Sequence, residues 1–357
     1  MSKQHNFGAG PCILPQEVFE EASKAVLDFN GLSILEISHR SKDFVAVMDE
    51  TVELVKKALN VPAGYTVLFL QGGASLGFLI SAMNMMRKNK KAAYINTGVW
   101  SKNAIKQAEM AGCAVDVIGS SEDKGFTYIP KNCTIPADVD YLHFTSNNTI
   151  YGTQFKSFPK SNIPLVCDMS SDIFSQVINV ADFDLIYAGA QKNLGPAGAT
   201  LFIVKEEALG KSSLEVLPTY LDLAVHHKKE SMFNTPPVFS IYVSMLNLRH
   251  LMKNGGVPAK QKQNEAKAKL LYDEIDANPL FKGTAAKEDR SNMNVTFLLT
   301  DESKQAEFDK MWNDAKIIGL KGHRDVGGYR ASLYNALPIE SVQVLVETMK
   351  EFAAVNA

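Results

Sequence analysis

A lysine and an aspartate each follow a short apolar run of strand type. Lys192 comes after residues 185–188 and before a segment dense in glycine and proline, and Asp168 directly follows residues 165–167. Ligands bind at the carboxyl ends of strands in open α/β sheets. The interval between Asp168 and Lys192 suits one crossover between neighbouring strands, which predicts that both residues lie at the same edge of the sheet. A desolvated lysine there can act as a nucleophile or form a Schiff base, and a carboxylate can hold a cationic ring nitrogen. The alternatives are a solvated loop lysine and an aspartate that caps a helix or joins a surface ion pair.

A glycine-rich turn, residues 71–77, joins another strand-like run to a helix-like one and contains Ala74 and Ser75. Glycine lets the backbone approach a ligand closely, and the start of a helix offers free N–H groups and the positive end of its dipole. A phosphate would therefore fit there. The spacing differs from G-x-G-x-x-G, and no lysine follows as in a nucleotide-binding P-loop. An ordinary turn is the alternative.

Five cationic or titratable side chains lie in otherwise uncharged surroundings: His39, Arg40, His323, Arg324 and Arg330. Arginine forks bind carboxylates and phosphates through two parallel hydrogen bonds. The set predicts an anion pocket, and the alternative is a group of unrelated surface charges.

The elements that must position these groups alternate along the chain. Short apolar runs predict strands at residues 65–70, 92–95, 114–118, 141–145, 165–167, 185–188 and 200–204. Apolar residues at helical spacing predict helices at residues 17–29, 43–59, 76–86, 100–111 and 240–252. This alternation predicts an α/β fold with a mostly parallel sheet and helices on both faces.

The texture of the sequence changes after residue 255. A strand is expected at residues 293–299, and helices are expected at residues 260–276, 303–315 and 339–354. We therefore divide the chain into an N-terminal arm (1–16), a large domain (17–255) and a small C-terminal α+β domain (256–357).

Composition excludes several classes of protein. The 357 residues include 37 Lys and Arg against 39 Asp and Glu, a net charge of −2, with no block of like charge. This balance argues against binding to nucleic acid or acidic membranes. No apolar run reaches the length of a membrane span, and the N-terminus lacks the apolar stretch of a signal peptide. Four scattered cysteines predict reduced thiols. We expect a cytoplasmic protein without a metal site.

Together these clusters resemble the phosphoserine aminotransferases, pyridoxal-phosphate enzymes of the aspartate-aminotransferase fold type (fold type I). The likeness runs over essentially the whole chain and is specific because nine motifs occur in the right order at the right intervals. They are residues 6–11 with 14–15, 37–41, 72–75, 96–98 with Trp100, 147–152, 168–171, 190–196, 234–237 and 322–338. The resemblance implies a large domain with a seven-stranded, mostly parallel sheet and a small C-terminal domain.

The resemblance also implies pyridoxal 5′-phosphate as cofactor and a role for four side chains around its ring. Lys192 would link covalently to the cofactor as a Schiff base. Asp168 would pair with the pyridinium nitrogen and keep it protonated, so that the ring can act as an electron sink. Trp100 would stack on the ring face, and Thr149 would form a hydrogen bond on the side of the phenolic oxygen.

The cofactor phosphate has a second set of implied partners. Ala74 and Ser75 would bind it with Gln191 beside them. Asn234 and Thr235 would reach it from the neighbouring subunit, which implies a homodimer with shared active sites.

The implied substrates are small anions. Arg330 would bind the substrate α-carboxylate, and His39, Arg40, His323 and Arg324 would hold the distal anion. That anion is a phosphate in 3-phosphohydroxypyruvate and O-phosphoserine, and a side-chain carboxylate in L-glutamate. The implied reaction belongs to serine biosynthesis, and 4-phosphohydroxy-L-threonine of pyridoxine biosynthesis would fit the same pocket.

Two positions depart from the family pattern. Gly8 and Ala9 stand where the family usually carries a serine, and Asn148 stands where it commonly has a glutamate. Among rivals of the same fold, a cysteine desulfurase needs a mobile nucleophilic cysteine in its second half, and the last cysteine is Cys167, inside a predicted strand. A serine–glyoxylate aminotransferase would not need the histidine–arginine pairs. A non-catalytic scaffold would have no use for Lys192 beside an electron sink, and a nicotinamide dehydrogenase would need the glycine fingerprint.

Overall fold

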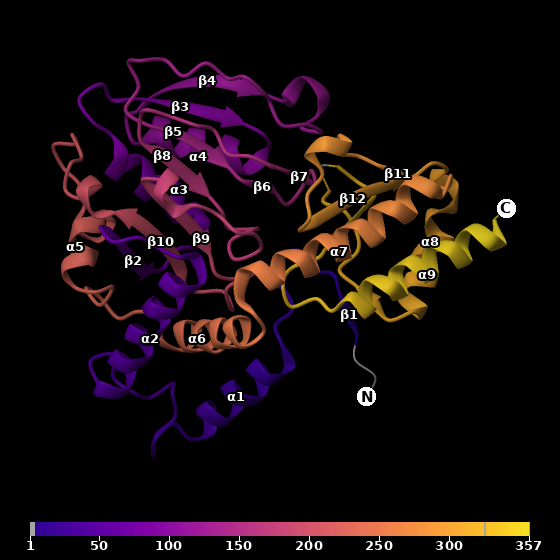
Figure 1. Ribbon diagram of the computed structural model, residues 1–357, viewed down its shortest axis with the longest axis horizontal. Coiled ribbons are helices and arrows are strands. Elements are labelled where there is room, and N and C mark those ends of the chain that lie inside the picture. Colours follow the sequence, from indigo (N-terminus) through magenta and orange to yellow (C-terminus); the bar gives the residue numbers. More distant parts are fainter. Residues whose placement is uncertain (1–3, 325, 357) are drawn as a thin grey trace.

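A computed structural model describes residues 4–324 and 326–356, and a seven-stranded sheet dominates it (Figure 1). The strands lie in the order β2 (Tyr65–Leu70), β10 (Thr200–Lys205), β9 (Leu185–Gly189), β8 (Leu165–Asp168), β5 (Leu142–Thr145), β3 (Lys91–Asn96) and β4 (Ala114–Ser120). β10 is antiparallel to both its neighbours, and the other pairs are parallel. The predicted mostly parallel sheet is confirmed.

Both faces of this sheet are buried, which explains why its strands read as continuous apolar runs. Leu68 and Leu70 of β2 pack toward the core that holds α3 (Gly73–Met85), α4 (Val99–Met110) and α5 (Leu223–Lys228). Val67 and Phe69 alternate with them and pack in a second core. That core holds α1 (Gln16–Leu27), α2 (Lys42–Leu59) and α6 (Val238–Lys253).

A separate core belongs to the C-terminal part of the chain, seen to the right in Figure 1. It lies between an antiparallel sheet and three helices. The sheet has the order β11 (Phe281–Gly283), β12 (Asn294–Leu299) and β14 (Tyr329–Ser332). The helices are α7 (Gly256–Ala277), α8 (Gln305–Asp314) and α9 (Ile339–Val355).

The N-terminal residues join this C-terminal core. β1 (His5–Asn6) pairs in parallel with β13 (Ile317–Ile318), and Phe7 is fully buried among the C-terminal apolar residues. A short hairpin, β6 (Asn147–Asn148) with β7 (Thr153–Gln154), completes the strands described here. Within residues 4–324 and 326–356, no helix is both long and apolar enough to cross a bilayer.

Two helices, α3 and α7, begin three and four residues earlier than the sequence pattern predicts, and glycine explains both. α3 begins at Gly73 because Gly72 adopts φ 93° and forms its N-cap. α7 begins at Gly256, whereas the sequence pattern predicts a start at residue 260. Gly255, at φ 89°, is the N-cap of α7, and Pro258 lies in the first turn, where its missing N–H costs nothing.

Candidate active site

One cavity of about 320 Å³ lies at the carboxyl edge of the large sheet. Asp168 is the last residue of β8, which pairs in parallel with β9, and Lys192 follows β9 by three residues. The predicted meeting of these two side chains at one sheet edge is therefore observed. The predicted site residues that line this cavity are Ala74, Ser75, Trp100, Thr149, Asp168, Gln191, Lys192, His323 and Arg330.

Lys192 is buried, with only 9% of its surface exposed. Its Nζ donates a hydrogen bond to Thr149 Oγ1 at 2.7 Å and lies 5.8 Å from the centroid of the Trp100 ring. Burial lowers the pKa of Lys192 to about 8, although the nearby Asp168 carboxylate opposes this shift. A substantial fraction of the amine is therefore neutral, and nucleophilic, in mildly alkaline solution.

Asp168 is 3% exposed, and burial raises its pKa. The Ser170 backbone N–H, which lies 2.9 Å from Asp168 Oδ1, and the positive charge of Lys192 both favour the ionised form. The Ser170 hydroxyl oxygen accepts the N–H of Gly189 at 3.1 Å and so ties β8 to the end of β9. Sequence reasoning gave Ser170 no role, and its place two residues after a strand-end aspartate was the available signal.

A second buried carboxylate, Asp172, lies close to Asp168 and was not singled out from the sequence. Burial raises the pKa of Asp172 to about 6. Its oxygens accept hydrogen bonds from the Ser146 hydroxyl and, at 3.1 Å, from Gln154 Nε2. The site thus places two carboxylates near the Lys192 amine.

The N-terminus of α3 forms another wall of the cavity. Gly72 precedes the helix, and Gly73, Ala74 and Ser75 in its first turn line the cavity. The free N–H groups of a first turn and the positive end of the helix dipole together bind anions. The geometry fits the phosphate site expected at this turn.

Arg330, on β14, brings a cation from the C-terminal part of the chain. Its Nη1 donates to the Thr149 carbonyl oxygen at 3.4 Å. Its Nε is buried and has no hydrogen-bond partner among the described residues, and the same holds for Trp100 Nε1. Burial lowers the pKa of Arg330. A buried guanidinium with an unused donor is suited to a carboxylate ligand.

Five of the residues expected at the site do not line this cavity: His39, Arg40, Asn234, Thr235 and Arg324. His39 is buried, and its Nε2 has no hydrogen-bond partner within the described ranges. Arg40 and Arg324 are exposed, as are Asn234 and Thr235. The Thr235 carbonyl oxygen accepts a hydrogen bond from Gln71 Nε2 at 2.7 Å. Binding roles for these five stay predictions.

The two departures from the expected family pattern have structural roles. Asn148 Oδ1 accepts the hydroxyl of Thr97 at 3.2 Å, and its Nδ2 donates to Thr153 Oγ1 at 3.0 Å. These bonds hold the turn that carries Thr149. Ala9 lines the cavity, and its carbonyl oxygen accepts the hydroxyl of Tyr334 at 3.0 Å.

No cluster of three or more His, Cys, Asp or Glu side chains that could hold a metal ion occurs among residues 4–324 and 326–356.

Comparison with known proteins assigns this fold and site to a class. Residues 4–345 match the family model of aminotransferase class-V, and the chain belongs to that family. It is 62% identical to the phosphoserine aminotransferase of Flavobacterium psychrophilum over 98% of both chains. The solved phosphoserine aminotransferase of Bacillus circulans subsp. alkalophilus superposes with a TM-score of 0.96 at 42% identity over 99% of both chains. The solved, pyridoxal-phosphate-bound phosphoserine aminotransferase of Trichomonas vaginalis superposes with a TM-score of 0.92 at 33% identity, over 98% of this chain and 100% of that one.

Proposed function

We propose that this chain is a pyridoxal-phosphate-dependent phosphoserine aminotransferase. It transfers the amino group of L-glutamate to 3-phosphohydroxypyruvate, reversibly, and yields O-phospho-L-serine and 2-oxoglutarate. The observation that carries the proposal is that the buried Lys192 amine, Asp168 and Arg330 share one cavity. The Arg330 Nε has no hydrogen-bond partner among the described residues and so can bind a ligand. The high identity to phosphoserine aminotransferases over nearly the full chain supports the choice of substrates.

The residues of the cavity fit pyridoxal phosphate group by group. The first turn of α3 suits its phosphate, and Asp168 suits the protonated ring nitrogen. Lys192 offers an amine to its aldehyde, and Trp100 lines the same cavity and provides an aromatic ring for stacking. When bound, this cofactor supplies an electron sink that acidifies the α-proton of an amino acid.

Lys192 is proposed to remove and return the α-proton of the amino acid as general base and acid. Because burial lowers its pKa to about 8, the amine can take up and release a proton near the working pH of an enzyme. Its hydrogen bond to Thr149 Oγ1 at 2.7 Å orients Nζ within the cavity. Because only 9% of the Lys192 surface is exposed, few water molecules compete for that proton.

Arg330 is proposed to bind the α-carboxylate that all the substrates share. The distal group differs, because it is a phosphate of charge near −2 in one substrate and a carboxylate of charge −1 in the other. His323 lies on the cavity wall, and we propose that His39, Arg40 and Arg324 join it to hold either anion. Several cations rather than one fork suit a site that accepts two charges.

The same proposal extends to the oligomeric state of the protein and to the metabolic pathway of its reaction. A homodimer would let Asn234 and Thr235 of a second copy reach the cofactor phosphate, and both are exposed in the single chain. We place the reaction in cytoplasmic serine biosynthesis. The site would also accept 4-phosphohydroxy-L-threonine, the related substrate of pyridoxine biosynthesis, because it carries the same two anionic groups.

The absorption spectrum of the purified holoenzyme tests the proposed reaction in halves. L-Glutamate alone should bleach the yellow chromophore, and 3-phosphohydroxypyruvate alone should then restore it. Pyruvate and glyoxylate, which lack the phosphate, should restore it far more slowly. Recovery that is as fast with glyoxylate would instead identify an aminotransferase for small substrates.

A further inference from the structure

Two asparagine side chains join the chain segments that carry the proposed active-site groups. Asp168 ends β8, Lys192 follows β9, and Arg330 lies on β14, so three separate elements must hold a fixed relation. Asn193 follows Lys192 directly, and Asn335 lies five residues after Arg330. Neither asparagine lines the cavity that contains the proposed catalytic groups.

Asn193 bonds to both of the other segments. Its Nδ2 donates to the carbonyl oxygen of Ile173 at 3.1 Å, in the turn that follows Asp168. Its Oδ1 accepts the backbone N–H of Asn335 at 2.9 Å. The loop that carries Lys192 is therefore tied to the segment that follows Arg330.

The side-chain amide of Asn335 both donates and accepts a hydrogen bond. Its Nδ2 donates to the carbonyl oxygen of Phe174 at 2.9 Å, and its Oδ1 accepts from Asn264 Nδ2 at 2.9 Å. Phe174 has φ 60°, a left-handed conformation that is unfavourable for an aromatic residue and persists only where neighbouring contacts hold it. Asn335 supplies one such contact.

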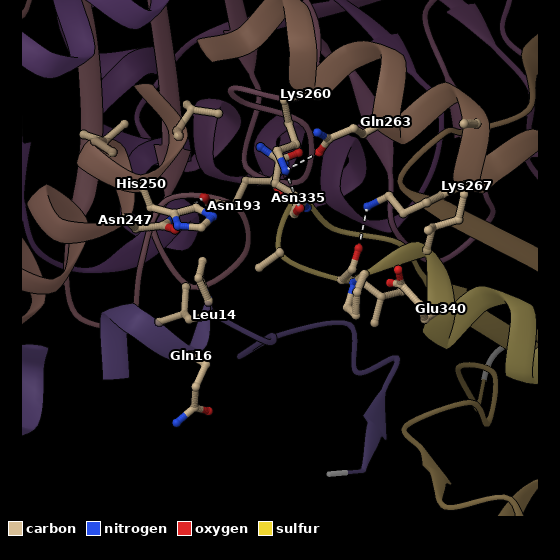
Figure 2. Close-up of a pocket in the computed structure, with 18 residues that line it drawn as sticks. Leu14, Gln16, Asn193, Asn247, His250, Lys260, Gln263, Lys267, Asn335 and Glu340 are labelled. Atoms are coloured by element: carbon tan, nitrogen blue, oxygen red, sulfur yellow. Dashed lines mark hydrogen bonds between the residues drawn. The ribbon is translucent and has the colours of Figure 1, made fainter. Parts of the chain in front are cut away.

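Helix α7 clamps the backbone of the same segment. Lys260 Nζ donates to the carbonyl oxygen of Asn335 at 3.1 Å. Lys267 is 2% exposed, and its Nζ donates at 2.9, 2.9 and 3.1 Å to the carbonyl oxygens of Leu333, Tyr334 and Leu337. Figure 2 shows Asn193, Lys260 and Asn335 close together on the wall of a second cavity, of about 530 Å³. The segment after β14 is thus held at several points.

We propose that Asn335 is a positioning residue whose side chain ties the segment after Arg330 to the turn after Asp168, through the carbonyl oxygen of Phe174, and thereby sets the affinity for the substrate α-carboxylate. The proposal rests on the proposed role of Arg330. Displacing a binding group by about 1 Å can cost up to about 100-fold in efficiency, so a link of this kind has measurable consequences. Because Asn335 acts through Arg330, its effect belongs to carboxylate binding and not to the proton transfer at Lys192.

A double-mutant cycle tests this coupling in the holoenzyme. Asn335→Ala should raise KM about tenfold for both glutamate and 3-phosphohydroxypyruvate, while kcat changes less than about threefold. In an Arg330→Ala background, the same substitution should change the second-order rate constant with glutamate by less than about twofold. An equal loss in both backgrounds would mean that Asn335 acts independently of Arg330, and would overturn the proposal.

Asn278→Ala is the control, because Asn278, which is buried where Asn335 is half-buried, likewise donates from its side-chain amide to a backbone carbonyl, that of Met349, at 3.3 Å in the C-terminal core. It should lower thermal stability comparably and leave KM unchanged. If Asn335→Ala does not fold, Asn335→Asp replaces it, since it keeps the size and the acceptor for Asn264 but loses the amide donor to Phe174.

Binding without turnover separates this proposal from the proposed function. Glutarate, a five-carbon dicarboxylate without an amino group, should bind the Asn335→Ala holoenzyme about tenfold more weakly by calorimetry, and the Asn278→Ala holoenzyme as tightly as the unaltered protein. An unchanged glutarate affinity in Asn335→Ala would overturn the positioning role. Failure of the unaltered enzyme to react with glutamate would instead remove the proposed reaction.

Discussion

The protonation of one amine depends on how deeply it is buried. Lys192 lies beside two carboxylates, yet desolvation is the largest influence and lowers its pKa to about 8. An ion pair at the surface would have shifted the pKa the other way. The packing around the amine therefore lowers its pKa toward neutral pH, and the carboxylates limit the shift.

This pKa predicts how the cofactor-free protein responds to pH. Between about pH 8 and 10.5 the unfolded chain still binds the Lys192 proton that the folded chain has released, so the free energy of unfolding rises with pH. Lys192→Met removes this dependence. The variant should be more stable than the unaltered apoprotein at pH 7, and urea unfolding should show this advantage shrinking by about 3 kcal/mol by pH 11. An advantage that is constant with pH would contradict the depressed pKa.

At the scale of elements, the turn between β2 and α3 requires glycine at position 72 for two reasons, its backbone conformation and the space beside it. Gly72 has φ 93°, and a Cβ there would lie 2.5 Å from Leu76 Cβ. Any other residue at this position must distort the first turn of α3, whose N–H groups are proposed to bind the cofactor phosphate. The backbone geometry at the strand end and the helix start therefore shapes the proposed anion site.

Gly72→Ala should therefore weaken cofactor binding. We expect the dissociation constant for pyridoxal phosphate, measured by fluorescence titration of the apoprotein, to rise at least about tenfold, which corresponds to about 1.4 kcal/mol. Gly64→Ala is the matched control, because Gly64 also has positive φ (82°) just before β2 but has open space around its Cβ position. Equal cofactor affinity in both variants would show that the turn does not bind the phosphate.

Sequence reasoning performed best where the signal was local. Apolar runs identified the strands of the large sheet, and the strand-end positions of Asp168 and Lys192 placed them at one edge. β14 was not predicted as a strand, because its four residues, Tyr329–Ser332, contain no apolar run. The contacts of Asn335 escaped for a different reason, since its partners Phe174 and Asn193 lie more than 140 residues earlier.

At the scale of the whole molecule, residues from both the large sheet and the C-terminal part of the chain line the cavity. Lys192 and Asp168 come from the large sheet, whereas Arg330 belongs to the C-terminal sheet with its separate core. The division at residues 16 and 255 stays a prediction, and so does the sharing of sites between two copies. Five expected site residues do not line the cavity of the single chain, and two of them, Asn234 and Thr235, are proposed to act across the dimer, so the oligomeric state tests that part of the proposal.

The proposed homodimer makes a direct prediction. Sedimentation at micromolar concentration should give twice the chain mass of 39.2 kDa. Thr235→Ala should weaken pyridoxal phosphate binding several-fold without dissociating the dimer, because the side chain would contact the partner's cofactor. A monomer with full cofactor affinity and activity would exclude the shared site.

The central claim is that Lys192 carries the cofactor, and chemical trapping tests it most directly. Borohydride reduction of the holoenzyme should fix the cofactor irreversibly, and mass spectrometry of a proteolytic digest should find the added mass on the peptide containing Lys192. The Lys192→Ala protein should give no labelled peptide. A label on any other lysine, or none in the unaltered holoenzyme, would contradict the account.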